Sequence, residues 1–299
     1  MEPPTMPLLS RSALLCLTAL IFFPALARAQ EDLLSLLEEE ETVNYTTASF
    51  KTNRVINLHS LENTARGVLD VKISHRFGFV NQGISEFFGL DNATTRLALE
   101  MGLTDRLAVG LGRTTYEKTV DGFLKYKFLR QSTGAKKMPI TAAFLTTMAV
   151  KTIPFEEPDR ENYFTSKLYY TFQLIVGRKF SEGFSLQLSP TLVHRNLVET
   201  TAEKNDVFAL GVAIRQKLTT RFSLNAEYIY VLPNQLAPSF RNSFSIGFDI
   251  ETGGHVFQLH FTNSTSMVEK GFIAETTGNW LDGDIHFGFN ISRVFTIFR

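Results

Sequence analysis

Hydrophobic and polar residues alternate along the last part of the chain. From 286 to 297 the odd-numbered positions are mostly aromatic or aliphatic and the even-numbered ones mostly polar, with Arg293 and Val294 as the interruptions. A β-strand points successive side chains to opposite faces, so this segment predicts a strand with one apolar and one polar face. A strand of this length is long enough to cross a bilayer.

Similar alternation recurs from Gly67 onward and predicts twelve strands. Their connections mostly alternate between short and long, as in membrane barrels with short turns at one rim and longer loops at the other. Only 117–120 and 130–138 break this rule. We therefore predict an all-β fold, an antiparallel up-and-down transmembrane β-barrel with a short N-terminal leader. The predicted strands are 67–80, 94–102, 106–116, 121–129, 139–152, 162–179, 184–198, 206–218, 222–232, 242–251, 255–263 and 283–297.

The turn residues support these registers. Gly253 and Gly254 can adopt the positive φ angles of a two-residue hairpin, which pairs Thr252 with His255 and keeps the apolar positions of both strands on one face. Three-residue connections at 181–183 and 219–221 preserve the phase in the same way. The apolar phase is expected to face lipid and the polar phase the barrel interior.

The N-terminal part divides into two predicted segments. Residues 1–29 have a positive start, a short apolar stretch and a small-x-small cleavage site, so they predict an export signal. Residues 30–66 are interpreted as a periplasmic leader or a plug, and 67–299 as the outer-membrane barrel. Within the leader, Glu31 to Glu41 is consistent with either a short amphipathic helix or a flexible acidic segment, and Ser60 is placed to cap a brief helical turn.

Composition narrows the function classes. The formal net charge is +0 and the mean hydropathy is −0.01, so no basic excess is available to attract nucleic acid. No later window holds about eighteen uninterrupted apolar residues, which argues against a helical membrane protein. The only cysteine, Cys16, lies in the predicted signal, and the six histidines are dispersed without a metal-binding motif. We therefore expect no disulfide, no metal, no cofactor and no catalytic residue.

The polar phase supplies the candidate lumen residues. Both signs of charge occur among them, and the predicted registers place Arg215 opposite Asn225 and Asp249 opposite Gln258. We favour a mutually paired interior over an open aqueous pore, because twelve strands lie between the filled and the wide-channel sizes of barrels. The lumen-facing candidates are Lys125, Lys127, Gln173, Arg215, Asn225, Glu227, Asp249, Gln258, His260 and His286.

Aromatic residues of the apolar phase fall near the predicted strand ends. Such girdles flank the apolar slab of a bilayer in membrane barrels. The alternative is that a chain with 27 phenylalanines places aromatic rings everywhere. The predicted lipid-interface aromatics are Phe164, Phe180, Phe184, Phe222, Tyr228, Tyr230 and Phe295.

Several stretches of the chain resemble a known family. They are FKTNRVINLHSLENTARGVLDVKISHRFG, DGFLKYKFLRQSTG, FSLQLSPTLVHRNLV, AEKNDVFALG and GFDIETGGHVFQLHFTNST. Together they resemble a family of exported outer-membrane β-barrel proteins of Bacteroidetes-type bacteria, a domain of unknown function, over roughly 45–299. The resemblance implies an outer-membrane barrel and brings no reaction, ligand or catalytic residue.

The function predicted from these observations is non-enzymatic. We expect a narrow channel or binding barrel for small polar solutes in the bacterial outer membrane, with membrane lipids and the barrel assembly machinery as its partners. Two alternatives remain from the sequence, a structural outer-membrane protein with a plugged lumen and a soluble periplasmic lipocalin-like barrel. In the latter the apolar phase would face inward around a greasy ligand. An outer-membrane enzyme is a third class, for which the sequence brings no catalytic group together.

Overall fold

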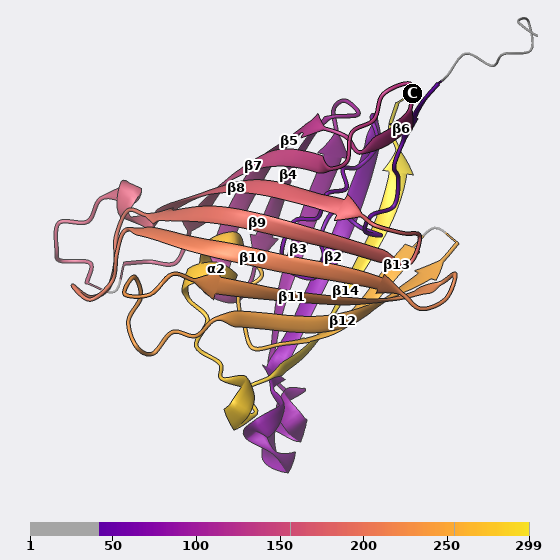
Figure 1. Ribbon diagram of the computed structural model, residues 1–299. Helices are drawn as coiled ribbons and strands as arrows, with labels where there is room; N and C mark the ends of the chain where they lie inside the picture. The colour runs from indigo at the N-terminus through magenta and orange to yellow at the C-terminus, as the bar shows by residue number, and fades with distance from the viewer. Residues whose placement is uncertain (1–41, 156, 254, 299) are drawn as a thin grey trace, which may run out of the picture. The chain divides into compact units, whose positions relative to one another are not determined.

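A computed structural model describes residues 42–155, 157–253 and 255–298. These residues fall into two units, a small one that includes 42–44 and 134–136, and a large one that includes 45–133 and 137–298. The large unit contains a closed barrel (Figure 1). The predicted export signal and the acidic segment from Glu31 to Glu41, interpreted as either a short helix or a flexible leader, lie outside the described residues.

Twelve strands form the barrel, as the alternation predicts. Neighbouring strands are all antiparallel, and the sheet closes where β14 pairs with β2. Closure pairs the edge that an open sheet would leave exposed, which is the requirement for a sheet in hydrocarbon. The strands are β2 (Val68–Phe79), β3 (Ala93–Gly102), β4 (Leu107–Thr114), β5 (Thr119–Leu129), β7 (Thr141–Lys151), β8 (Leu168–Lys179), β9 (Phe184–Arg195), β10 (Asp206–Lys217), β11 (Phe222–Val231), β12 (Ser243–Thr252), β13 (His255–Thr262) and β14 (His286–Thr296).

The predicted strand ends differ from the structure mainly at the long-loop rim. Strand β8 begins six residues later than predicted, because a short 3-10 turn, η4 (Phe164–Lys167), occupies its expected start. Strand β9 ends at Arg195, where the side chain turns inward and donates hydrogen bonds to Glu203 and to the Lys204 carbonyl oxygen. Two three-residue strands outside the closed sheet, β1 (Val43–Tyr45) and β6 (Ser132–Gly134), are too short to leave a periodic signal.

The predicted registers are confirmed. Thr252 pairs with His255 across the glycine turn, and Asp249 pairs with Gln258 further along the same two strands. Arg215 lies opposite Asn225 across the connection 218–221 between β10 and β11. The turn residues therefore fix which side chains share a face.

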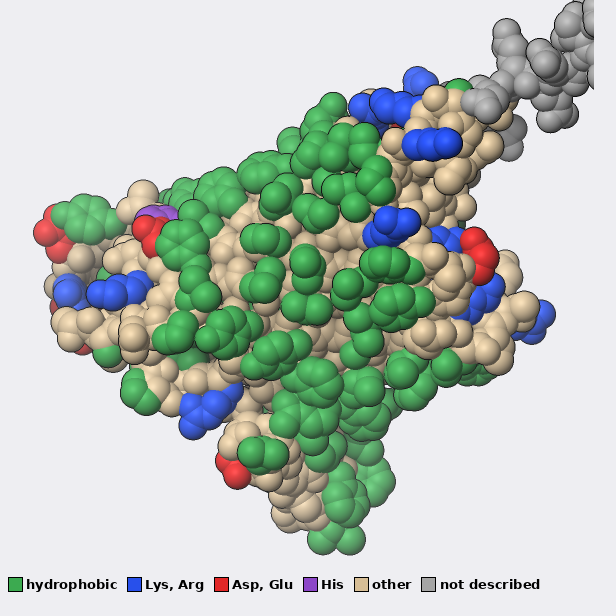
Figure 2. Space-filling model, viewed as in Figure 1, with side chains coloured by type: hydrophobic (Ala, Val, Ile, Leu, Met, Phe, Trp, Pro, Cys, Tyr) green, Lys and Arg blue, Asp and Glu red, His purple; other side chains and the backbone are tan. Residues whose placement is uncertain are grey.

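The two faces of the sheet are chemically different. Along β8 the side chains of Thr171, Gln173 and Ile175 are buried, whereas those of Phe172 and Leu174 are each 40% exposed on the outside. Figure 2 shows hydrophobic side chains over the middle of the wall, with the charged side chains gathered toward its ends. The apolar phase thus faces outward, which is the arrangement of a membrane barrel and the reverse of a lipocalin-like carrier.

Short helical elements lie in the connections. They are η1 (Val80–Gln82), η2 (Ile84–Gly89), η3 (Tyr116–Lys118), α2 (Glu269–Ala274) and η5 (Trp280–Asp282). All side chains of α2 are buried, and it contacts β8, β9 and β11. Among the described residues, no helix has the length and apolar character that a membrane crossing requires.

Candidate functional site: the plugged lumen

Residues 46–66, here called the plug hairpin, fold into the barrel interior before the chain enters β2. The hairpin reverses at its tip, residues 55–58, where the Val55 amide donates to the Leu58 carbonyl oxygen at 2.8 Å. Ser60 caps no helix, so that prediction is wrong. Its hydroxyl instead donates to the Thr52 carbonyl oxygen at 2.5 Å and closes the base of the hairpin.

A buried carboxylate holds the tip. Glu227 of β11 accepts hydrogen bonds from the backbone amides of Ile56, Asn57 and Leu58 at 3.2, 2.9 and 3.1 Å. A hydrogen bond to a charged group contributes about 1.5–3 kcal/mol, so three together are a substantial anchor. The side chain of Asn57 accepts from Arg76 at 2.6 Å on β2, which ties the tip to a second part of the wall.

The returning arm of the hairpin is bonded to the wall through its carbonyl oxygens. Lys125 of β5 donates to the carbonyl oxygens of Ser60 and Glu62, and Gln187 of β9 donates to that of His59 at 2.7 Å. The tip also uses its backbone in this way, because Gln258 donates to the Val55 carbonyl oxygen at 2.5 Å. These bonds satisfy peptide groups that would otherwise be buried without partners.

A charge cluster joins the plug hairpin to α2. Arg54 lies 2.8 Å from the Glu269 carboxylate at the start of α2 and 3.8 Å from Glu100 of β3, which also pairs with Lys72 at 3.2 Å. His59 lies 3.3 Å from Glu269. Burial, followed by the positive charge of Arg54, holds the pKa of His59 well below its ordinary value, so the ring is neutral near pH 7.

The opposite side of the hairpin is apolar. Its leucines pack on inward side chains of β7 to β11, and glycines make the space: a Cβ at Gly211 would lie 2.9 Å from Leu58, and one at Gly177 would lie 2.8 Å from Leu61. The sequence analysis did not predict this apolar inner wall. The small residues at inward positions of β10 are the feature of the sequence that indicates it. The cluster comprises Phe50, Val55, Leu58 and Leu61 of the hairpin, Ala108, Phe123, Ala143, Leu145, Ile175, Val193, Val207, Ala209, Ala213, Ile229 and Val231 of the wall, and Phe272, Ile273 and Ala274 of α2.

The other end of the lumen is closed by α2, which is fastened by a group we call the α2 clasp. Lys270 pairs with Glu117 at 2.5 Å and with Glu275 at 2.7 Å, and its ammonium lies 4.5 Å from the centre of the Tyr169 ring. Lys151 of β7 also pairs with Glu117, at 2.6 Å. Burial lowers the pKa of Lys270 despite both carboxylates. Burial alone would raise the pKa of Glu117, but Lys270 and Lys151 outweigh it and lower that pKa.

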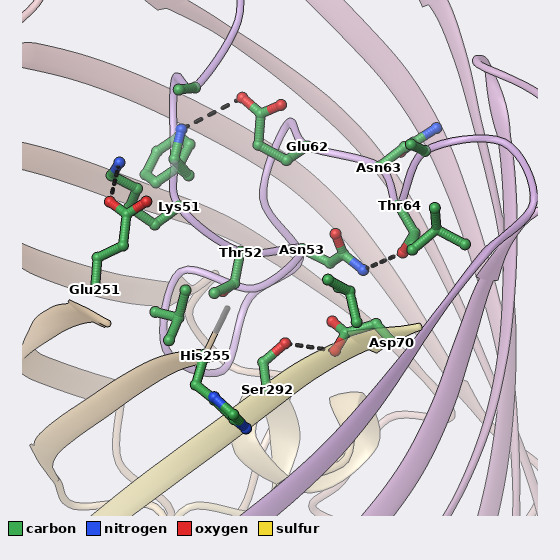
Figure 3. A pocket seen from close by; sticks show the side chains of 16 residues that line it. Lys51, Thr52, Asn53, Glu62, Asn63, Thr64, Asp70, Glu251, His255 and Ser292 are labelled. Atoms are coloured by element: carbon green, nitrogen blue, oxygen red, sulfur yellow. Dashed lines mark hydrogen bonds and ion pairs between the residues drawn. The ribbon is translucent and has the colours of Figure 1, made fainter. Parts of the chain in front are cut away.

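A cavity of about 530 Å³ remains between the base of the hairpin and the short-turn rim. Figure 3 shows that hairpin residues and the ends of β2, β12, β13 and β14 line it. Lys51 pairs with Glu251 across one side, and the Ser292 hydroxyl donates to Asp70 at 2.5 Å on another. The lining therefore presents both signs of charge next to apolar surface.

The structure places nine of the ten predicted lumen residues in the buried inward phase of the barrel. Lys127 is the half-buried tenth. These residues have different partners. The hairpin is hydrogen-bonded by Lys125, Glu227 and Gln258, whereas Asn225 faces Arg215 within the wall. The buried nine are Lys125, Gln173, Arg215, Asn225, Glu227, Asp249, Gln258, His260 and His286. Arg54, Arg76 and Glu269, which the prediction did not include, are further buried charged residues of the lumen.

The predicted interface aromatics lie on the outer surface. Phe184 is half-buried, and the other six are exposed, with Phe164 in η4 rather than in a strand. Their contact with lipid headgroups stays a prediction. The exposed six are Phe164, Phe180, Phe222, Tyr228, Tyr230 and Phe295.

Potential metal-ligating side chains are dispersed over the part of the chain that the structure describes. No three His, Cys, Asp or Glu side chains among them gather in a way that could hold a metal ion. One His–Asp pair, His194 with Asp206 at 2.7 Å, lies partly exposed on the outer face of β9 and β10. Its strand neighbours are Tyr170 on one side and the aspartate itself on the other.

Residues 50–295 match the family described as a membrane bound beta barrel domain (DUF5777). The chain belongs to this family. The DUF5777 barrel is therefore membrane-bound, and the soluble lipocalin-like alternative is not favoured.

Solved structures similar to this DUF5777 barrel include outer-membrane proteins. The NanC porin has a TM-score of 0.49 at 8% identity, with 76% of this chain and 98% of that chain covered. The KdgM porin has a TM-score of 0.47 at 8% identity, covering 76% and 99%. Outer membrane phospholipase A from Escherichia coli has a TM-score of 0.40 at 11% identity, covering 84% and 96%. Among proteins of curated function, none matches the DUF5777 barrel.

Proposed function

We propose that this barrel is a non-enzymatic outer-membrane protein of Bacteroidetes-type bacteria that binds and passes small polar solutes, with the plug hairpin as its gate. The observation that carries the proposal is the convergence of three amides of the hairpin tip on one wall carboxylate, Glu227. A plug fastened through its backbone to a polar wall can exchange those bonds for bonds to water or solute when it moves.

The two sides of the hairpin have different consequences for gating. The polar side faces a wall with charges of both signs, which suits an aqueous path once the hairpin is displaced. The apolar side buries Leu58 and Leu61 against the wall, and each buried leucine contributes about 1.5–3 kcal/mol, so the closed state is the resting one.

The cavity at the short-turn rim is the proposed solute entrance. Its volume of about 530 Å³ lies within the usual range for small-molecule sites, about 300–1,000 Å³. Because Lys51 and Asp70 give its lining both signs of charge, we expect small polar solutes without a strong preference for anions or cations. Short turns normally face the periplasm, so this entrance opens there.

Export through the predicted signal and insertion by the outer-membrane assembly machinery belong to the same proposal. A closed barrel with an apolar outside needs such a route, because its strands are too polar on one face to enter a membrane singly.

Conductance of the reconstituted protein tests the gate. Glu227→Ala removes the acceptor of the three tip amides, and we expect it to raise the ratio of conducting to closed states at least tenfold over wild type, which corresponds to a loss of at least about 1.4 kcal/mol in the stability of the closed state. Gln173→Ala is the matched control, because the Gln173 side chain donates to Thr191 within the wall, and it should conduct like wild type.

Deletion of residues 46–66 removes the plug outright and should give a steadily open channel. Heat-modifiable migration shows whether each variant is a folded barrel. If the folded deletion variant conducts no better than lipid alone, the channel proposal is wrong and a structural barrel with a filled lumen is favoured.

A further inference from the structure

Two loops at the long-loop rim form one structure, here called the rim projection, from residues 80–92 and 279–285. The Val80 amide donates to the Ile285 carbonyl oxygen at 2.8 Å, and Asn81 donates to the Asp282 carbonyl oxygen and to the Asp284 carboxylate at 3.1 and 2.7 Å. The loops carry η1, η2 and η5 and extend past the ends of β2 and β3 at the foot of Figure 1.

Large apolar side chains cover this projection. Leu281 is 95% exposed and Ile84 82% exposed, and three more apolar side chains beside them are also exposed. A loop in water normally carries small and polar residues, and exposed apolar patches on proteins usually mark a contact surface. The exposed apolar side chains are Ile84, Phe87, Phe88, Leu90 and Leu281.

The backbone holds two of these rings outward at a conformational cost. Phe87 and Phe88 have φ angles of 46° and 55°, and Gly89 follows with φ of 84°. Bulky residues rarely adopt this left-handed region, and such strain tends to persist where it serves a contact. Hydrogen bonds fix the turn, since the Phe88 amide donates to the Gly83 carbonyl oxygen at 2.7 Å.

The projection is continuous with the lipid-facing wall. Trp280 packs edge-on against Phe244, an outward residue of β12, with ring centres 5.1 Å apart, and its indole N–H donates to the Phe244 carbonyl oxygen at 3.0 Å. Phe287 of β14 stacks on Phe77 of β2 at the same rim, with centres 5.8 Å apart. Figure 2 shows hydrophobic side chains on the wall and on the projection below it.

The charges of the projection indicate which part of a membrane it meets. Its two loops contain four carboxylates and no lysine or arginine, so phosphate headgroups are not its ligand. Three carboxylates are hydrogen-bonded within the projection: Glu86 to Asn92 at 3.1 Å, and Asp282 and Asp284 to Asn279 at 2.6 and 3.0 Å. They are therefore partly satisfied without water.

We propose that the rim projection is a membrane anchor, a loop structure that lies in the acyl-chain boundary of the bilayer beside the β14–β2–β3 wall. The apolar belt of the barrel thus extends past the strand ends on this side. An interfacial tryptophan with apolar neighbours is the usual composition of such a boundary.

A spin label at Leu281 tests the anchor in the full-length protein reconstituted into phosphatidylcholine vesicles. The variant is Leu281→Cys in a chain with Cys16→Ser, and the readout is relaxation by oxygen, which partitions into lipid, against a water-soluble nickel chelate. We expect oxygen to relax the Leu281 label more strongly than the chelate. At Thr201→Cys, an exposed residue of another long loop, we expect the reverse order.

Two results overturn the proposal. Stronger relaxation of the Leu281 label by the nickel chelate means that the projection lies in water. An immobilised label that neither reagent reaches means that a protein surface covers it. Leu281 is almost fully exposed, so its replacement leaves the fold intact, which heat-modifiable migration verifies.

Discussion

At the scale of single residues, the lumen is built from polar side chains that depend on partners distant in sequence. Glu227 is bonded by a hairpin about 170 residues earlier in the chain, and Arg76 reaches Asn57 on that hairpin and the carbonyl oxygens of Ser264 and Ser266 in the loop before α2. A buried charge without such partners would be strongly destabilising. Glu227 therefore stabilises the closed lumen only when the hairpin is in place, and Arg76 also needs the loop before α2.

His59 gives the closed state a pH dependence. Burial keeps its folded pKa far below 6.5, whereas the displaced hairpin exposes the ring to water and restores a pKa near 6.5. Below about pH 6.5 the displaced state binds more protons than the closed state, so the closed state loses stability as the pH falls. The loss is at most about 1.4 kcal/mol per pH unit. Above about pH 6.5 the stability of the closed state does not depend on His59. We expect the open fraction in bilayer recordings to rise between pH 7 and about pH 5.

The matched variant for this prediction is His59→Gln, which cannot be protonated. Its open fraction should depend less on pH than that of wild type, although other buried histidines such as His260 remain. Identical pH profiles for the two proteins would show that His59 is not the responsible group.

At the scale of elements, the lumen is closed from both ends by segments that the alternation pattern does not describe. The plug hairpin fills the short-turn end, and α2 with its clasp fills the long-loop end. The two meet where Arg54 pairs with Glu269. Each element is too short to be stable alone, since helix nucleation and an isolated hairpin are both unfavourable in water. Tertiary contacts therefore decide their conformation.

The α2 clasp depends on the positive charge of Lys270, and its removal should loosen α2. Lys270→Met keeps the length of the side chain and its contact with Tyr169 but leaves Glu275 without its ammonium partner. We expect α2 to open more readily by about 2 kcal/mol, less than the 3–5 typical of fully buried pairs because Glu117 and Glu275 are partly exposed. Hydrogen exchange at the Phe272 and Glu275 amides should quicken more than tenfold.

Lys204→Met serves as the control for this measurement, since the Lys204 side chain is exposed. It removes the same charge from the chain without touching α2. Equal exchange rates for the two variants would mean that the clasp does not hold the helix.

At the scale of the whole barrel, two features stabilise the fold in a membrane. The sheet is closed, and its outer face is apolar while much of its inner face is polar. Every barrel strand is paired on both sides, so no row of peptide groups in the sheet is left open to hydrocarbon. The outward side chains are mostly apolar on every strand. The inward side chains are polar over one part of the wall and apolar over the part where the hairpin and α2 pack.

Photolabelling with a probe confined to the lipid tests this separation over the whole wall. We expect modification at Phe172, Ile214 and Phe289, and at least tenfold less at the adjacent inward Gln173 and Arg215, because a one-position step moves a side chain through the wall. Mass spectrometry of the digested protein gives the ratio. Preferential labelling of the two inward residues would mean that the sheet is inside out.

The sequence by itself determined the wall of this barrel. A period of two, turn glycines such as Gly253 and alternating short and long connections depend on neighbours along the chain, so strand number, register and facing could be read directly. The same pattern identified Glu227, Gln258 and Lys125 as inward residues. It did not reveal what they bind.

Only the tertiary structure decided what fills the lumen. Residues 46–66 have no periodic signal, because the two sides of the hairpin meet different parts of the wall, apolar β7–β11 and the polar strands opposite. Ser60 looked like a helix cap because its local sequence allows one, whereas contacts with distant strands impose a hairpin. Pairs such as Arg54 with Glu269 join residues 215 positions apart, and their proximity is a property of the closed barrel alone.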